Sequence, residues 1–219
     1  MARHPRARCS PPNAGPRRGG RVGGGCWPGR SCPVVNAVSR LSDASTSLLL
    51  VIDLQERLLP RIHESERVVA RSVRLIEGAR LLGIPILATE QYPKGIGPTV
   101  EPVRSLLEGV PTFAKTSFGA LGDAAVAQAV EDIGPRTLML VGIEAHVCIT
   151  QTALQGLDGG MDVHVVTDAV SSRSPSDLAV GLQRMAAAGA TPVTSEMALY
   201  EWLRDAASPC FKDVLKLVK

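Results

Sequence analysis

The chain has 219 residues, of which 45% are hydrophobic and 21% charged, so it is long enough for one domain with a sizeable core. No apolar run approaches the ~20 residues needed to cross a bilayer, and we expect no membrane partner. Eight arginines and no acidic residue lie in residues 1–42, which leaves residues 43–219 with a net charge of −5. A mildly acidic body argues against a nucleic-acid partner for the folded part.

Residues 1–42 form a leader with seven glycines, six prolines and no hydrophobic periodicity. Such a composition buries too little apolar surface to offset its ordering entropy, so we predict a disordered leader followed by a folded domain over residues 43–219. Two alternatives stay open for the leader: an organelle transit peptide, and an arginine-rich arm for nucleic acid. We expect a cytoplasmic protein, or an organelle-targeted one if the leader is a transit peptide.

From Ser45 onward, short apolar runs alternate with segments of helical periodicity. The pattern predicts strands at 47–52, 84–88, 111–115, 137–141, 161–167 and 191–194, and helices at 68–82, 103–107, 123–133, 149–157, 178–188, 195–206 and 211–218. This alternation predicts an α/β domain of three layers, in which a mostly parallel sheet has helices on both faces. The carboxyl ends of its strands would meet at one edge, which is where ligands bind.

Three side chains with complementary chemistry fall at that edge. Asp53 directly follows the first strand, Lys115 ends the third, and Cys148 lies where the strand 137–141 gives way to a helix. Asp53 can act as the general base for the thiol, and Lys115 can hold the aspartate and favour the thiolate. Backbone N–H groups in the turn can stabilise an oxyanion, and the helix dipole also favours the thiolate. Together they predict a hydrolase of C–N bonds in small molecules, acting through a thioester.

Each of these residues also has an ordinary structural explanation when it is considered alone. A free cysteine is often a small buried hydrophobe, an aspartate after a strand often caps a helix, and a lysine is usually solvated. Two other functions therefore stay open. The chain can be a non-catalytic interaction protein that keeps the fold, or a redox-sensing protein in which Cys148 is oxidised.

Several further residues are assigned to the surroundings of this constellation. Leu58, Gln91, Tyr92 and Phe118 lie on edge loops and are candidates to line an apolar pocket with one amide donor. His146, two residues before the cysteine, would have to fold back onto its own loop to act as a base, so it is assigned to the pocket wall or to a structural role.

Two polar residues at or near strand ends are assigned structural roles. His164 alternates with valines and is expected to be satisfied in the core, and Asp168 is expected to anchor a loop with Arg173 as its ion partner. The chain has no GxGxxG or P-loop spacing, so no nucleotide cofactor is expected.

Five segments carry a resemblance to the isochorismatase-like cysteine hydrolases: LLLVIDLQ at 48–55, TEQYPKGIGPT at 89–99, AKTSFGAL at 114–121, GIEAHVCI at 142–149 and VVTDAVSSRS at 165–174. The resemblance covers almost all of residues 46–219, and the second and fifth segments are most similar to the isochorismatase domain-containing subgroup. It implies a Rossmann-like sheet, a homo-oligomer and a triad of Asp53, Lys115 and Cys148. It also implies a non-proline cis peptide, Ile143–Glu144, that directs the amides of Glu144 and Cys148 at the oxyanion.

The chain departs from two members of that superfamily. Nicotinamidases carry an aspartate and histidines after the second strand as metal ligands, where this chain has Thr89, Glu90, Gln91 and Tyr92. We therefore expect no metal, no other cofactor and no nicotinamidase activity. True isochorismatases do not rely on a cysteine nucleophile, so Cys148 argues against that reaction.

Overall fold

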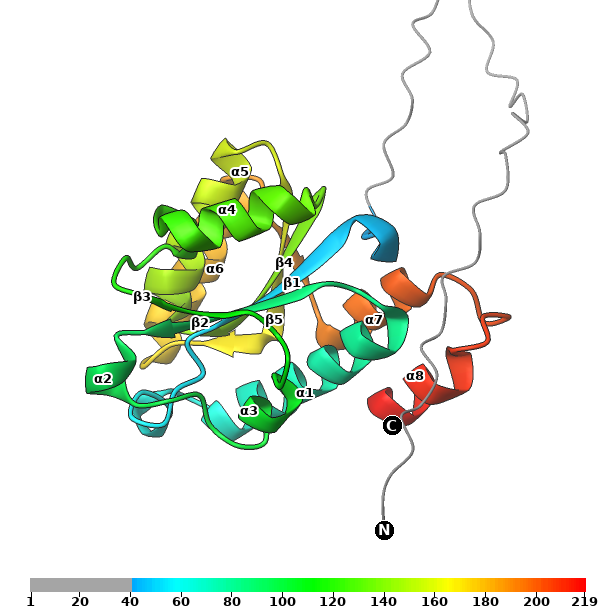
Figure 1. Cartoon of the computed structure of the whole chain (residues 1–219), viewed down its shortest axis with the longest axis horizontal. Coiled ribbons are helices and arrows are strands. Elements are labelled where there is room, and N and C mark those ends of the chain that lie inside the picture. Colours follow the sequence, from blue (N-terminus) through cyan, green and yellow to red (C-terminus); the bar gives the residue numbers. More distant parts are fainter. Residues whose placement is uncertain (1–40) are drawn as a thin grey trace, which may run out of the picture.

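The computed structural model describes residues 41–219, which form one sheet surrounded by helices (Figure 1). The strands are β1 (Ser47–Ile52), β2 (Ile86–Gln91), β3 (Thr112–Lys115), β4 (Thr137–Ile143), β5 (Asp162–Ser171) and β6 (Thr191–Val193). The α-helices are α1 (Ser65–Leu82), α2 (Pro93–Ile96), α3 (Val103–Leu106), α4 (Ala124–Ile133), α5 (Thr150–Asp158), α6 (Pro175–Ala187), α7 (Ser195–Leu203) and α8 (Phe211–Val218). Short turns of other helix types are η1 (Ala44–Thr46), η2 (Leu59–Arg61), η3 (Ala120–Gly122) and the π-helical η4 (Ala145–Ile149).

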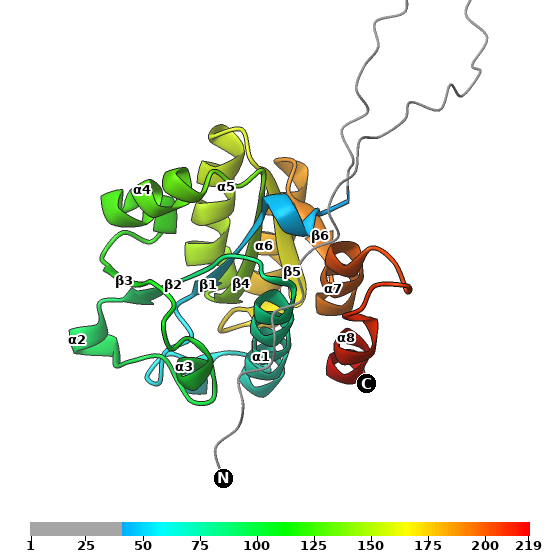
Figure 2. The same cartoon turned by 45° about the vertical axis from the view of Figure 1, so that its right-hand side comes forward.

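The sheet confirms the predicted α/β architecture. Its strand order is β3-β2-β1-β4-β5-β6, and all neighbouring strands are parallel. Helices α4, α5 and α6 lie on one face, whereas α1 and α7 lie on the other with α8 packed outside them (Figures 1 and 2). This is the order of doubly wound Rossmann folds, in which the chain reverses its direction of travel across the sheet between β1 and β4. Ligands bind at that switch point, beyond the carboxyl ends of the two strands.

Two apolar cores lie on opposite faces of the sheet. Successive side chains of a strand point to opposite faces, so β1 divides its residues between them. Leu49 and Val51 join the core beneath α1 and α7, whereas Leu48, Leu50 and Ile52 join the core beneath α4, α5 and α6. Every residue of β1 is buried. This explains why its sequence is a continuous apolar run and not an alternating one.

Strand β4 runs two residues further than predicted, because Gly142 continues the strand. Gly142 has a φ of +133°, and a Cβ atom there would lie 2.0 Å from the carbonyl oxygen of Ile52. Only glycine permits this close approach of β4 to β1. The helix predicted to begin at Ile149 begins at Thr150, after the π-helical turn η4.

Strand β5 also runs past its predicted end at Thr167, because a β-bulge interrupts its pairing with β4. The bulge contains Asp168, which accepts hydrogen bonds from the N–H and Oγ of Ser195 at 2.7 and 2.6 Å. The ion partner of Asp168 is Arg71, at 3.4 Å. The prediction of Arg173 was wrong, because Arg173 turns to Glu144 instead.

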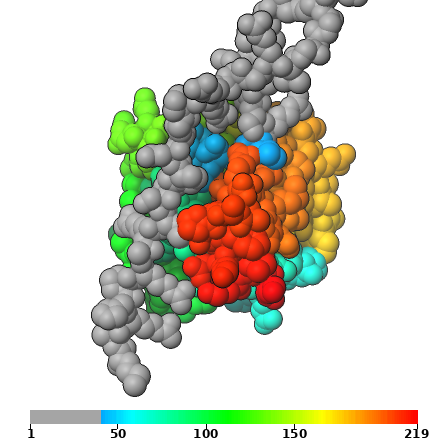
Figure 3. Space-filling model, turned by 90° about the vertical axis from the view of Figure 1, so that its right-hand side faces the viewer, coloured from blue at the N-terminus to red at the C-terminus, as the bar shows by residue number. Residues whose placement is uncertain are grey.

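Ser42, the last residue assigned to the predicted leader, contacts the folded part. Ser42 is buried, its N–H donates to Glu201, and its hydroxyl lies 2.9 Å from Nδ1 of the buried His164, which is thus satisfied as expected. The rest of the predicted leader lies outside the described residues. Helices α7 and α8 form one continuous surface (Figure 3, orange and red). No helix of residues 41–219 has both the length and the apolar character that a bilayer crossing requires.

Candidate active site

Asp53, Lys115 and Cys148 meet at the carboxyl edge of the sheet. The Lys115 Nζ donates to Asp53 Oδ2 at 2.8 Å, and both side chains are fully buried. Cys148 is 5% exposed, and both the charge of Asp53 and a hydrogen bond to it contribute to the raised pKa of the thiol. The three residues come from β1, β3 and the turn after β4, so the strand order alone brings them together. The predicted convergence is therefore present in the structure.

Asp53 is held from several directions. It has a φ of +56°, a left-handed conformation that aspartate tolerates better than most residues, and its N–H donates to the Thr89 carbonyl at 3.1 Å. The Thr89 hydroxyl donates to Asp53 Oδ1 at 2.8 Å. With Lys115 on Oδ2, each carboxylate oxygen has a donor. Left-handed residues other than glycine cluster at functional sites, where surrounding contacts hold them.

Lys115 has more acceptors than its ammonium has protons. Besides Asp53, the Nζ lies 2.6 Å from Gln91 Oε1 and 3.2 and 3.3 Å from the carbonyl oxygens of Ser117 and Phe118. This set compensates the burial of the charge, because a buried ammonium is tolerated only when it is paired and hydrogen-bonded.

Cys148 is a protonated thiol in this environment. Burial, the negative charge of Asp53, the hydrogen bond to Asp53 and the charge of Glu144 raise its pKa to about 12, against the lowering effect of Lys115. The expectation that the site favours the thiolate was wrong. Lys115 is already committed to Asp53, so its attraction does not offset the desolvation of the sulfur and the nearby carboxylates.

The turn before the cysteine differs from expectation in its backbone. The Ile143–Glu144 peptide is trans, since the one cis peptide among residues 41–219 is Glu101–Pro102. The chain turns instead through Glu144, which has a φ of +55° and leads into η4. π-Helical turns are rare and frequent at functional sites.

Thr152 links this turn to η3 through two hydrogen bonds. The Thr152 hydroxyl donates to the Cys148 carbonyl at 2.7 Å and accepts from the N–H of Ala120 at 2.8 Å.

The five predicted pocket residues divide into three groups. Gln91 contacts Lys115 directly, and His146 lies beside Glu144 in the turn that carries Cys148. Tyr92 and Phe118 lie at the rim with 55% and 56% of their surface exposed, although their backbones contact Lys115. Leu58 packs against the core beneath α1.

Sequence reasoning missed several residues that support the site. Thr89 positions Asp53, and the fully buried Gln55 fixes the end of β2 by accepting from the Gln91 N–H at 2.8 Å and donating to the carbonyls of Gln91 and Gly97 at 3.0 and 2.7 Å. Both residues stand in segments that the resemblance had singled out. Their polar side chains beside apolar strand ends were the available signal.

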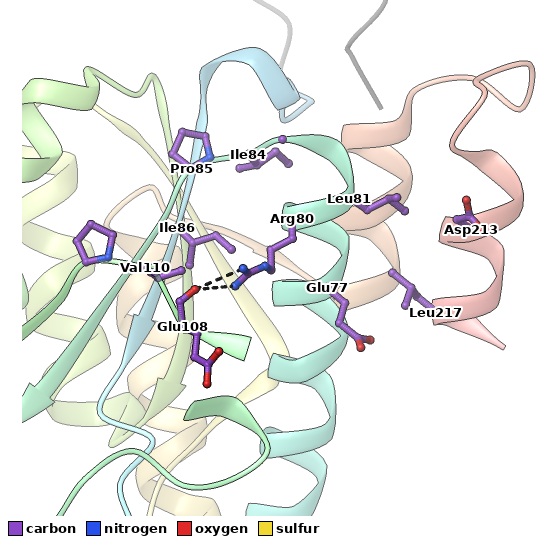
Figure 4. Close-up of a pocket in the computed structure, with 13 residues that line it drawn as sticks. Glu77, Arg80, Leu81, Ile84, Pro85, Ile86, Glu108, Val110, Asp213 and Leu217 are labelled. Carbon is purple, nitrogen blue, oxygen red and sulfur yellow. Dashed lines mark hydrogen bonds between the residues drawn. The ribbon is translucent and has the colours of Figure 1, made fainter. Parts of the chain in front are cut away.

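Two cavities lie away from this site. One, of about 720 Å³, is lined by the C-terminal half of α1, the start of β2, the loop before β3 and α8, and there Arg80 reaches the Glu108 carbonyl (Figure 4). The other, of about 560 Å³, lies along the first half of α1. Neither is lined by Asp53, Lys115 or Cys148. Within residues 41–219, no group of three or more histidine, cysteine, aspartate or glutamate side chains could hold a metal ion.

Comparison with known proteins finds the same family at the level of sequence and of structure. The family model "Isochorismatase domain" matches residues 47–197. The isochorismatase domain-containing protein 2 of Danio rerio is 41% identical over 182 residues, which are 83% of this chain and 90% of that protein.

Solved structures agree with these sequence matches. The MAR1 ribonuclease of Caenorhabditis elegans is 40% identical, with a TM-score of 0.75 over 81% of this chain and 92% of its own. YcaC from Pseudomonas aeruginosa, solved with hexane-2,5-diol and covalent acrylamide, is 25% identical with a TM-score of 0.78 over 82% and 92%. The family match includes the strands and the turn that carry all three central residues, and the chain belongs to the isochorismatase family.

Proposed function

We propose that this protein is a cysteine hydrolase that cleaves a C–N bond in a small amide-like substrate, with Cys148 as nucleophile, Asp53 as proton carrier and Lys115 as the charge that holds Asp53. One observation carries the proposal: the Cys148 thiol lies near Asp53, which raises the pKa of the thiol, and a buried ammonium holds that carboxylate at 2.8 Å. A thiol that already donates to its base can lose its proton as the new bond forms.

In the proposed acylation, Sγ attacks the amide carbon while the thiol proton passes to Asp53. The carbonyl electron pair moves to oxygen, where the backbone N–H groups of Glu144 and Cys148 are proposed to stabilise it. The pair then returns, the C–N bond breaks, and Asp53 gives its proton to the leaving nitrogen. An amine or ammonia departs and a thioester remains on Cys148.

In the proposed deacylation, water attacks the thioester carbon and Asp53 accepts its proton. The C–S bond breaks, the sulfur takes the proton back, and a carboxylic acid leaves. Lys115 tolerates both states of Asp53, because Gln91 and two backbone carbonyls still accept from its ammonium when the carboxylate is neutral.

Burial supports a small substrate. Only 5% of the Cys148 surface is exposed, and the other two side chains are covered completely. A bulky peptide or polymer would need the surrounding loops to move, so a short amide is the better-suited substrate.

Two rival functions fit these observations less well. A redox sensor needs a thiolate, and the raised pKa of Cys148 disfavours one. The C. elegans relative is named a ribonuclease, but residues 43–219 of this chain carry a net charge of −5, which repels a polyanion. An interaction protein that keeps the fold stays the alternative if the site proves inert.

The proposal is tested by incubating the protein with a panel of small primary amides, with ammonia release and acid-quenched intact mass as readouts. We expect turnover that disappears in Cys148→Ala, and an acyl adduct on Cys148 during turnover. Cys32→Ala, which removes a cysteine outside the described residues, serves as the control and should behave as wild type. Absence of Cys148-dependent turnover across the panel, together with absence of an adduct, would refute the proposal.

A further inference from the structure

The Glu144 carboxylate has one oxygen with a partner and one without. Its side chain is 14% exposed, and Oε1 lies 3.1 Å from Nε of Arg173. Oε2 is buried and accepts no hydrogen bond. A buried carboxylate oxygen without a donor is costly, and native structures leave few such groups without a reason.

His146 does not satisfy this oxygen. Its Nδ1 lies 3.6 Å from Oε2, beyond hydrogen-bond distance, and only 3.0 Å from the Ser172 hydroxyl. The backbone N–H of His146 also donates to that hydroxyl, at 3.3 Å. The Nδ1 atom is thus hydrogen-bonded to Ser172 and can add only a longer charge contact to Glu144, whose Oε2 accepts no hydrogen bond.

The unpaired oxygen belongs to the surroundings of the thiol. Glu144 directly precedes the π-helical turn that carries Cys148, and the charge of its carboxylate contributes to the raised pKa of the thiol. Its backbone N–H is also proposed above to contact the oxyanion. A substrate bound at Cys148 would therefore come within reach of a carboxylate oxygen that has no donor in the protein.

We propose that Glu144 Oε2 is a specificity-determining acceptor, which binds an N–H group on the substrate at a position other than the scissile amide. The preferred substrates are then small amides that also carry an amine or a second carboxamide. This inference rests on the proposed hydrolase function and adds the chemical class of substrate.

The electrostatics of the site agree with this assignment. The negative charge of Glu144 is one of the contributions that raise the pKa of the Cys148 thiol. A donor on Oε2 would draw part of that charge away from the sulfur, and would thus ease its deprotonation when the right substrate is bound.

The experiment compares two pairs of amides with matched shapes. β-Alaninamide carries an ammonium where butyramide carries a methyl group, and malonamide carries a second carboxamide where acetoacetamide carries a methyl ketone. We expect wild type to prefer the donor-bearing member of at least one pair by about ten- to hundredfold in kcat/KM, the value of a charge-assisted hydrogen bond. A preference in the first pair identifies an ammonium as the recognised group, and a preference in the second pair identifies a neutral carboxamide.

Glu144→Gln is the decisive variant. Its carbonyl oxygen can still accept from Arg173, which turns an NH₂ group toward the place of Oε2, so a donor on the substrate meets a donor on the protein. We expect the preference ratio to fall to about one or to invert, mainly through KM. The ratio is taken within each variant, so a general loss of activity cancels. Glu196→Gln, which removes an exposed carboxylate from α7, is the matched control and should keep the wild-type ratio.

Calorimetric binding of the same four amides to Cys148→Ala separates this inference from the proposed hydrolysis. If no amide is turned over, a donor preference in binding that disappears in Cys148→Ala/Glu144→Gln still supports the acceptor role. Equal binding of both members of each pair, or a donor preference that survives Glu144→Gln, would overturn it.

Discussion

At the scale of single residues, the buried pair of Asp53 and Lys115 governs the site. A buried ion pair adds little net stability, but removal of one partner leaves an uncompensated charge in the interior. The pair also fixes the carboxylate that contacts the thiol. Sequence reasoning could place both residues, because each directly ends a predicted strand.

The first prediction concerns this pair. Lys115→Met keeps an apolar stem but leaves the Asp53 carboxylate without its ammonium, so we expect it to lower the free energy of unfolding by about 3–5 kcal/mol. Asp53→Asn/Lys115→Met should recover most of this loss, since no charge then stays buried. Urea unfolding of the three proteins measures both effects. A double variant as unstable as the single one would contradict the explanation.

The second prediction concerns the protonation of Cys148. Its pKa of about 12 means that alkylation by iodoacetamide should be slow near neutral pH and rise about tenfold per pH unit, without the plateau that an ordinary thiol shows near pH 9. Asp53→Asn removes two contributions that raise this pKa, so it should speed alkylation while slowing amide hydrolysis by about 10²–10⁴-fold. Site-resolved mass spectrometry follows the adduct. An alkylation plateau at pH 9 would show that the thiol is not protected.

The third prediction concerns Thr89. Thr89→Val removes the donor to Asp53 Oδ1 with little change in shape, so we expect hydrolysis to fall by about tenfold and stability by about 1–3 kcal/mol. Thr167→Val is the matched control, since that hydroxyl donates to the Val193 carbonyl outside the site. It should cost stability without lowering the activity of the remaining folded enzyme.

The protonation state could not be predicted from the sequence. A cysteine at the start of a helix and a nearby lysine both indicate a thiolate. The sequence shows that these groups are present, but not how they are arranged. The outcome depends on how deeply the sulfur is buried and on which partner the lysine already holds. Both quantities exist only after folding.

At the scale of elements, the contact between β1 and β4 sets the position of the centre. The two strands carry Asp53 and the turn to Cys148 at their carboxyl ends, and Gly142 lets them approach. Apolar runs and glycines in the sequence predicted the strands themselves. The apolar pattern could not show that Gly142 continues β4, because that depends on how closely the backbone of Ile52 approaches it in the folded protein.

The fourth prediction follows from this contact. In Gly142→Ala a Cβ would lie 2.0 Å from the Ile52 carbonyl oxygen at a φ of +133°, so we expect a loss of about 3 kcal/mol or more and loss of hydrolysis. Gly160→Ala is the control, since its φ is +80° and nothing lies within 4 Å of the added atom. It should cost about 1 kcal/mol, the backbone term alone. Equal losses in the two variants would show that the close approach is unimportant.

The bulge in β5 and the π-helical turn were also beyond prediction. Both insert extra residues into a regular pattern, and such an insertion leaves no distinct mark in hydrophobic periodicity. Asp168 shows the effect, because its partner is Arg71 on α1 and not the nearby Arg173.

At the scale of the whole molecule, the strand order explains why a site could be predicted at all. The reversal between β1 and β4 places their carboxyl ends side by side at one edge of the sheet, and the residues that follow these strands in sequence meet there. The aromatic rim of Tyr92 and Phe118 is exposed beside it. In a homo-oligomer, such a rim would be covered.

The fifth prediction is therefore an oligomeric state. We expect light scattering after size exclusion to give a multiple of the 23.1 kDa chain mass at micromolar concentration. Tyr92→Ser/Phe118→Ser should lower that mass, whereas Tyr200→Ser on α7 should leave it unchanged. A monomeric wild type would refute the prediction.

Asp53 and Lys115 precede β4 in the sequence and Cys148 follows it, so the chain can be divided between them. A break at the exposed Gly134 would leave Asp53 and Lys115 on one fragment and Cys148 on the other. Neither fragment alone holds a complete reactive centre, and the centre forms only when β4 docks beside β1. Amide hydrolysis would then act as a split reporter, in which catalytic signal measures the association of two polypeptides.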